Sequence, residues 1–224
     1  MIYDVLLQLP VFQGITKDQL TGILEKIPFH FQKYQPEEVI VSSGDPCDSV
    51  LFVLSGTVTH EMPTYDGRVI VKQDFEGPYT MPFYYLFGVS TNMPSRLVAK
   101  NVVGIMKLEK KHFLDILQST TIPLVNVLNM LSTHAQKQHQ VMDFMSQKAV
   151  LARLASWLLT YTDRVGKDIF ITASEADWCK MLNTDPADFW RNVAILEGKH
   201  VIEQIDEGLK LIDRYALRGF VGNK

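Results

Sequence analysis

The spacing of apolar positions changes several times along the chain and predicts a succession of helical and strand-rich segments. Apolar residues at helical spacing follow Thr16-Lys17-Asp18-Gln19, a capping box that predicts a short opening helix. From about residue 29 to residue 108, short β-rich runs alternate with turn signals such as Ser55-Gly56 and Asp66-Gly67. Many short strands at this spacing are typical of a barrel or sandwich.

A long helix is predicted to begin near Pro123, and a heptad pattern runs through it. The stripe either packs on the β-rich segment of its own chain or forms a seam with a partner helix. We favour the partner helix, and hence a homodimer, because the stripe is longer than a one-sided core contact needs. The seam positions are Leu124, Leu128, Leu131, Ala135, Gln138, Met142 and Met145.

The last third of the chain predicts two short helices joined by a tight turn and followed by a hairpin. Thr172 and Glu175 are predicted to form the capping box of the first helix. Asp185 is predicted to cap the second helix, with Pro186 at its first position, and Gly198 to end it. Two β-rich runs then flank the turn Asp206-Glu207-Gly208. This arrangement is a winged helix-turn-helix, which points to double-stranded DNA as a partner.

Composition limits the remaining possibilities. A chain of 224 residues with 46% hydrophobic content can build the cores of one large or two modest domains. A net charge of −3 neither supports nor excludes DNA binding, because only the local potential matters. The two cysteines, Cys47 and Cys179, lie far apart, so no disulfide framework, zinc site or iron–sulfur cluster is indicated. Without a membrane-spanning run or a signal peptide, we expect a soluble cytoplasmic protein that does not bind membranes.

The segment from Gly44 to Val58, with its paired strands punctuated by glycine, is similar to the cyclic-nucleotide-binding β-rolls of the Crp/Fnr family of bacterial transcription regulators. The long helix and the winged helix strengthen this resemblance. It implies an α+β fold with a jelly-roll-like effector domain (residues 1–120), a dimerisation helix (121–145) and a winged helix DNA-binding domain (146–224). It also implies a homodimer, a small-molecule effector and RNA polymerase as a partner.

The effector segment departs from the family pattern. Where cyclic-nucleotide binders carry a Gly-Glu pair and an Arg-Ser or Arg-Thr pair, this chain has Pro82-Phe83 and Met93-Pro94. Cyclic AMP is therefore not the expected effector. Either an apolar or aromatic effector binds here, or the pocket is filled by its own side chains. The candidate pocket residues are Tyr79, Met81, Phe83, Tyr84, Ser95 and Arg96, of which Arg96 is the one candidate anion ligand.

The predicted recognition helix is acidic at its start. Arg191 matches the position from which the family offers an arginine to guanine in the major groove. Asn192 is adjacent, and Asp188 is placed to accept from a cytosine amino group. Candidate phosphate contacts are Lys180, Lys199, His200, Lys210, Arg214 and Arg218, of which Lys199 and Lys210 are the preferred ones.

Catalysis is not expected, because the scattered histidines and carboxylates form no recognisable catalytic motif. No metal site is predicted. No haem motif selects any of the candidate iron ligands His30, His60, His112, Cys47 or Met81. The alternative to a DNA-binding regulator is a dimeric small-molecule sensor or interaction protein that keeps this fold but has lost sequence-specific DNA binding.

Overall fold

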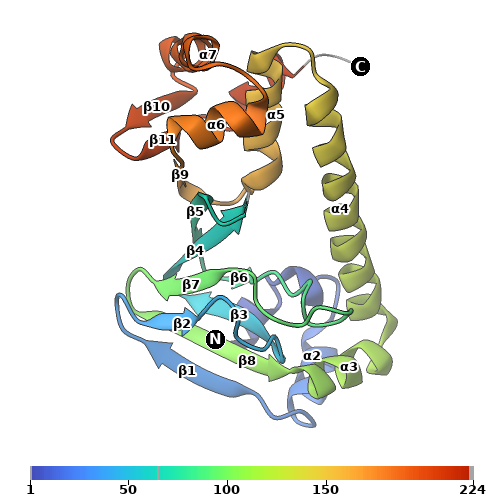
Figure 1. Cartoon of the computed structure of the whole chain (residues 1–224). Coiled ribbons are helices and arrows are strands. Elements are labelled where there is room, and N and C mark those ends of the chain that lie inside the picture. Colours follow the sequence, from blue (N-terminus) through green and yellow to red (C-terminus); the bar gives the residue numbers. More distant parts are fainter. Residues whose placement is uncertain (1, 65, 222–224) are drawn as a thin grey trace. The chain divides into compact units, whose positions relative to one another are not determined.

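The computed structural model describes residues 2–64 and 66–221, except for the side chains of residues 138–146. The chain forms two compact units (Figure 1). The first consists of residues 1–59 and 75–134, and the second of residues 60–74 and 135–224. The chain therefore passes between the units at three places, two of them at the ends of the segment 60–74.

The first unit begins with three short helical elements, α1 (Ile2–Leu6), η1 (Pro10–Phe12) and α2 (Lys17–Leu24). Thr16 caps α2 as predicted: its hydroxyl accepts from Gln19 N, and the Gln19 side chain accepts from Thr16 N. The buried side chains of these elements share one apolar cluster with helix α3 (Lys110–Ser119). The N-terminal elements thus close one side of the first unit.

Two antiparallel layers form the predicted β-roll. One contains, in spatial order, β1 (His30–Tyr34), β8 (Val103–Glu109), β3 (Ser49–Ser55) and β6 (Tyr79–Thr80). The other includes β2 (Val39–Val41), β7 (Arg96–Ala99), β4 (Thr57–Thr64) and β5 (Val69–Glu76). Gly56 makes the turn between β3 and β4 with φ +81°, and a Cβ there would lie 2.3 Å from Val102 O. No other residue type fits that turn.

Helix α4 (Thr121–Ser146) is the predicted long helix. One side packs on the first unit: Val127 is buried in its core, and the Asn126 amide donates to Val11 O and Gln13 O at 3.1 and 2.8 Å. Leu124 and Leu128, which lie beside this packed side, are exposed. The stripe is therefore divided between a face that packs on its own unit and a face that does not.

The second unit contains a winged helix, as predicted. Its helices are α5 (Val150–Tyr161), α6 (Glu175–Leu182) and α7 (Pro186–Gly198), and its strands are β9 (Lys167–Thr172), β10 (Ile202–Ile205) and β11 (Gly208–Leu211). The short helix η2 (Ala216–Phe220) follows. Trp157, Trp178 and Phe189 are the largest side chains of the core that these elements share.

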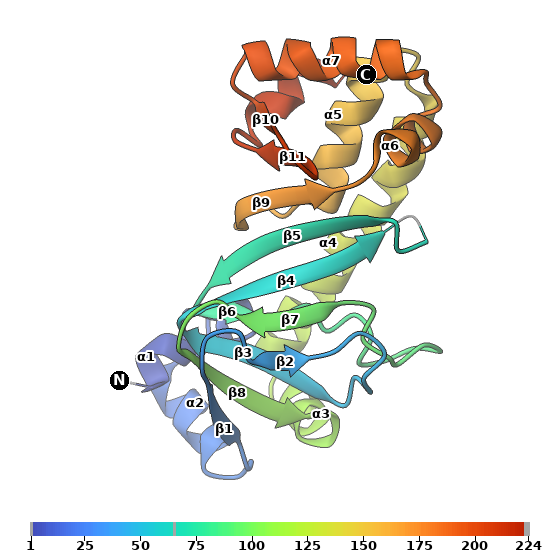
Figure 2. The same cartoon turned by 60° about the vertical axis from the view of Figure 1, so that its left-hand side comes forward.

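A hairpin from the β-roll sequence completes this second unit. Strand β5 pairs antiparallel with β9, with Val71 opposite Ile171 and Ile70 opposite Thr172, and β11 and β10 continue the sheet (Figure 2). Val69 and Val71 are fully buried in the winged-helix core. The hairpin is thus part of the fold of the winged-helix unit.

This pairing corrects one prediction. Thr172 does not cap α6, because it is held in β9 opposite Ile70. The N-cap is Ser174, whose hydroxyl accepts from Asp177 N at 3.1 Å. The predicted capping box was wrong because strand pairing with a distant segment extends β9 past the position where the local pattern would start a helix.

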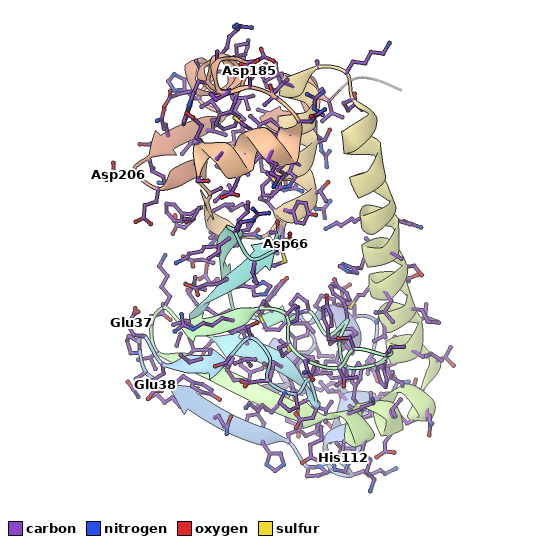
Figure 3. The ribbon with its side chains drawn as sticks, viewed as in Figure 1. Glu37, Glu38, Asp66, His112, Asp185 and Asp206 are labelled. Atoms are coloured by element: carbon purple, nitrogen blue, oxygen red, sulfur yellow. The ribbon has the colours of Figure 1, made fainter. Side chains whose placement is uncertain are left out.

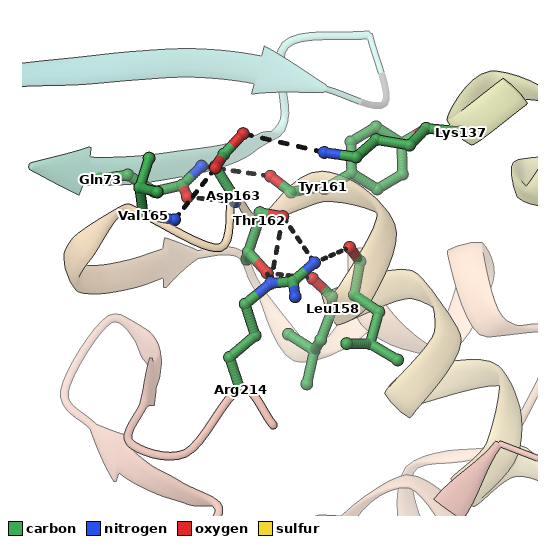
Figure 4. Close-up of polar contacts among 9 residues, drawn as sticks. Gln73, Lys137, Leu158, Tyr161, Thr162, Asp163, Val165 and Arg214 are labelled. Carbon is green, nitrogen blue, oxygen red and sulfur yellow. Dashed lines mark hydrogen bonds and ion pairs between the residues drawn. The ribbon is translucent and has the colours of Figure 1, made fainter. Parts of the chain in front are cut away.

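Gln73 adds a polar contact to the hairpin (Figure 4). Its side chain is buried, donates to Tyr161 O at 3.3 Å and accepts from Asp163 N at 2.6 Å. A Cβ at Gly166 would lie 2.7 Å from Gln73 Oε1, so this loop closes tightly over the amide. Gln73 thereby satisfies two backbone groups at the end of α5.

His60, also on the hairpin, is a second buried polar residue of this unit. Burial lowers its pKa to about 4, and the negative charge of Asp163 offsets only part of this effect. The folded state therefore holds a neutral imidazole at pH 7, while the unfolded chain takes up a proton near pH 6.5.

Replacement of Gln73 by Ala is expected to lower the free energy of unfolding by about 1–3 kcal/mol, because it leaves two backbone groups without partners. Urea unfolding followed by tryptophan fluorescence measures this, since all three tryptophans lie in the second unit. Lys72→Ala is the matched control on the same strand. It removes a partly exposed ion pair with Glu61 and should cost less than about 1 kcal/mol. Equal costs for the two variants would contradict the role given to Gln73.

The free energy of unfolding should also depend on His60. Between about pH 6.5 and pH 4 the unfolded state binds more protons than the folded state, so stability falls as the pH is lowered. From pH 7.5 to pH 5, the unaltered chain should lose roughly 2 kcal/mol more than His60→Gln. The exposed His200, changed to Asn, serves as the control. If the free energy of unfolding fell with pH by the same amount in the unaltered chain and in His60→Gln, the prediction would be wrong.

Candidate functional site

The helix-turn-helix is built by local hydrogen bonds. Asn183 ends α6 in the left-handed conformation with φ +49°, and Thr184 N donates to Cys179 O at 2.9 Å. Asp185 then caps α7 as predicted: its carboxylate accepts from Asp188 N at 2.9 Å, and Pro186 takes the first helical position. These contacts turn the chain within three residues and direct the start of α7 outward.

Aromatic packing fixes the two helices against each other. The rings of Trp178 and Phe189 stack with centroids 5.8 Å apart, and Trp157 contacts Trp178 edge to face at 5.0 Å. Trp190 donates from its indole N–H to the Glu175 carboxylate. The tryptophans therefore hold α7 in place.

Arg191 points into solvent from α7, with 69% of its side chain exposed. Its Nη1 donates to Asp188 Oδ1 at 2.8 Å, three residues earlier on the same helix. Two of the predicted DNA-binding residues are therefore joined in one ion pair, a contact that the sequence reading did not anticipate.

The other predicted DNA-binding residues differ in accessibility. Asn192 is buried, and its amide donates to Asp188 O at 2.7 Å, so this side chain is engaged within its own helix. Lys199 is exposed directly after α7. Lys210, in the wing, lies over the Phe170 ring at 5.6 Å.

Two further arginines of this unit support the fold. Arg153 donates to the carbonyls of Leu182 and Asn183 at the end of α6 and to those of Gln147 and Lys148. Arg214 donates to Leu159 O and Thr162 O at the end of α5 (Figure 4). Such carbonyls have no partner within their helix, and a cation is favourable there. Arg214, predicted as a candidate phosphate contact, is thus engaged in holding the end of α5.

Acidic side chains accompany the exposed cations. Asp185 lies at the start of α7 and Asp206 in the turn of the wing (Figure 3), and Asp188 and Glu207 follow close by in sequence. The face that a winged helix offers to DNA therefore carries both signs of charge.

The candidate effector segment is well packed. Met81 and Phe83 are each only 2% exposed. Met81 belongs to the cluster between the β-roll layers, whereas Phe83 contacts Phe113 of α3 edge to face at 5.5 Å. Tyr79 stacks on Phe75 at 4.6 Å. The side chains predicted to line an effector pocket thus also form the core of the first unit.

Polar groups near this segment differ in exposure. Ser95 is buried, whereas Arg96, at the start of β7, is exposed. The hydroxyl of Thr80, on β6, is buried without a hydrogen-bond partner among the described residues. Thr80 was not predicted, because nothing in a two-residue strand marks which side chain faces inward.

Tyr84 connects the effector segment to the long helix. Its ring stacks on that of His134 with centroids 3.5 Å apart and planes 15° from parallel. His134 is the last residue of the first unit before α4 passes into the second. The pair joins residues 50 positions apart, and no sequence pattern indicated it.

The predicted dimer seam is described in part. Leu124, Leu128 and Ala135 are exposed, and Leu131 is half-buried against the core of the first unit. The side chains of Gln138, Met142 and Met145 lie outside the described residues.

Within the described part of the chain, no three His, Cys, Asp or Glu side chains are grouped as a metal site requires. Nor is any described helix long and apolar enough to cross a membrane.

The family model of the cyclic nucleotide-binding domain matches residues 31–120. This interval contains β2 to β8 and all but the first residue of β1, and so includes the hairpin that completes the second unit. Comparison with curated protein sequences gave no match.

Solved structures of transcription regulators share the architecture. The catabolite activator protein of Thermus thermophilus is 15% identical over 95% of this chain and 98% of its own, with a TM-score of 0.54. FixK2 of Bradyrhizobium japonicum is 14% identical over 88% of this chain and 100% of its own, with a TM-score of 0.51. The sensor domain of the transcriptional regulator DNR of Pseudomonas aeruginosa is 18% identical over 60% of this chain and 89% of its own, also with a TM-score of 0.51.

At these identities the structures establish the fold alone. Residues 31–120 match the cyclic nucleotide-binding domain, and the chain has the fold of the Crp/Fnr-type transcription regulators that its sequence resembles.

Proposed function

We propose that this chain is a homodimeric, DNA-binding transcription regulator whose β-roll responds to a small molecule other than cyclic AMP. The observation that carries the proposal is the capped helix-turn-helix with Arg191 exposed on α7. A guanidinium in this place can make a bidentate contact with the O6 and N7 atoms of guanine.

The long helix supports the dimer. Leu124, Val125 and Leu128 are exposed on α4, beside a stripe that includes Val127 and is buried on the first unit. Leucines four residues apart on an unpacked face form a seam that a second copy of the helix covers. Two-fold symmetry then presents two recognition helices to successive major grooves, and the operator is a palindrome.

The effector segment supports a ligand without a cyclic phosphate. Burying an anion requires a cationic or hydrogen-bonding partner, but Phe83 occupies the position of the family's acidic residue, and Arg96 is exposed. An uncharged, largely apolar molecule is compatible with the Met81 and Tyr79 environment. The Thr80 hydroxyl is the polar group available to it.

A response to this ligand has a route to the long helix. The stacking of Tyr84 on His134 joins the effector segment to α4 within the first unit. A ligand that binds one arrangement of this segment better than another shifts the population of α4 arrangements, and with it the dimer.

The acidic side chains favour a second candidate function. Asp185, Asp188, Asp206 and Glu207 repel phosphates unless other contacts compensate. A dimeric sensor or interaction protein without sequence-specific DNA binding is therefore the competitor. It predicts no DNA affinity even at low salt, whereas a regulator with phosphate contacts binds tightly at low salt and loses affinity steeply as salt rises.

Replacement of Leu128 by Glu is expected to weaken dimerisation at least tenfold, about 1.4 kcal/mol, because it places a charge in the seam. Sedimentation equilibrium measures the dimer dissociation constant. Val102→Glu is the control, since Val102 is an equally exposed apolar residue outside α4. Association of Leu128→Glu as tight as that of the control would exclude this face from the dimer.

Selection of bound sequences from randomised duplex DNA tests the function, without ligand, with cyclic AMP and with a small-molecule extract of the host. We expect a palindromic motif that cyclic AMP does not alter. Arg191→Ala should then lose about 1–3 kcal/mol on the selected site and relax specificity at one base pair. Lys180→Ala, which removes an exposed charge from α6, should leave sequence preference unchanged. Failure to enrich any sequence under all three conditions would favour the sensor or interaction protein.

A further inference from the structure

The recognition helix carries an ion pair within its own exposed surface. Arg191 Nη1 lies 2.8 Å from Asp188 Oδ1, and 33% of the Asp188 side chain is exposed. Thr184 Oγ1 donates to Asp188 Oδ2 at 3.4 Å. The two Asp188 oxygens therefore have different partners: Oδ1 holds Arg191 and also accepts from Asn192 Nδ2 at 3.5 Å, whereas Oδ2 faces the turn before α7.

The position of Asp188 in α7 explains why this carboxylate is well placed. Asp185 is the N-cap, and Asp188 is the third residue of the helix, where the free backbone N–H groups and the helix dipole favour negative charge. Arg191 lies nearly one turn further on, so its guanidinium is drawn back toward the helix N-terminus. That end of a recognition helix contacts base edges.

We propose that Asp188 is a positioning residue that holds the Arg191 guanidinium for base reading and so sets the sequence specificity of this chain. The inference rests on the proposed DNA-binding function. Asp188 occupies one nitrogen of a guanidinium with five N–H donors, and the rest are available for guanine. The carboxylate itself does not need to touch a base.

The pairing has two opposite effects on binding. An arginine held in one orientation loses less conformational freedom when it contacts its base. The paired carboxylate also cancels much of the cation's attraction for phosphates, so binding to unrelated sequences is weakened. Both effects raise the ratio between specific and non-specific affinity.

The test compares Asp188→Asn with Asp185→Asn, measured on the selected site and on a scrambled duplex at several salt concentrations. Both variants remove one negative charge from the start of α7, and asparagine retains the N-cap at position 185. Of these two aspartates, Asp188 accepts from Arg191, whereas Asp185 accepts from the backbone N–H of Asp188. We expect Asp188→Asn to strengthen binding to the scrambled duplex and to lower the specificity ratio about tenfold. Asp185→Asn should strengthen binding to both duplexes alike and leave the ratio unchanged.

Further variants separate positioning from folding. Asp188→Ala should lower the specificity ratio at least as much as Asp188→Asn, with far-UV circular dichroism confirming that α7 is retained. In an Arg191→Ala background, Asp188→Asn should no longer change the ratio, because the residue it positions is gone.

Three outcomes overturn the proposal. Equal effects of Asp188→Asn and Asp185→Asn on a sequence-specific chain would show that Asp188 acts only through its charge. A fall in the ratio that persists without Arg191 would show that Asp188 reads the base itself. Absence of any sequence preference in the unaltered chain would overturn the regulator function together with this role of Asp188.

Discussion

The pairing of β5 with β9 is the contact on which the second unit depends. It places Val69 and Val71 of the β-roll hairpin in the same core as Trp157 and Trp178, and it covers an edge of the winged-helix sheet that would otherwise expose unpaired backbone groups. It also holds Thr172 in a strand, so α6 begins only after Ser174. The position of the helix-turn-helix therefore follows from a segment that lies about 100 residues earlier in the chain.

Cations in the second unit divide into supporting and exposed groups. Arg153 and Arg214 donate hydrogen bonds to backbone carbonyls at helix ends and so hold neighbouring elements together. Arg191 and Lys199 are exposed, and Arg191 forms an ion pair with Asp188. One of these two exposed cations is therefore already paired with a carboxylate. Any specific recognition of a duplex by such a surface has to come from a few well-placed contacts.

The first unit makes a different use of its side chains. Phe83, predicted to replace the acidic residue of cyclic-nucleotide binders, packs on α3, and the neighbouring Met81 packs between the sheets. Tyr84 extends the same packing to α4 through His134. The segment of residues 79–87 is thus joined by ring contacts both to α3 and to the helix that leads to the second unit.

The sequence alone determined the elements whose signals are short-range. The caps at Thr16 and Asp185, the wing turn, the β-roll and the long helix were all predicted correctly, because the residues that define them lie within a few positions of one another. Tertiary structure decided the rest: the hairpin's place in the second unit, the start of α6, the burial of Asn192 and the Tyr84–His134 stack. These depend on contacts between distant segments and on which side of an element faces a core, and no local pattern specifies either.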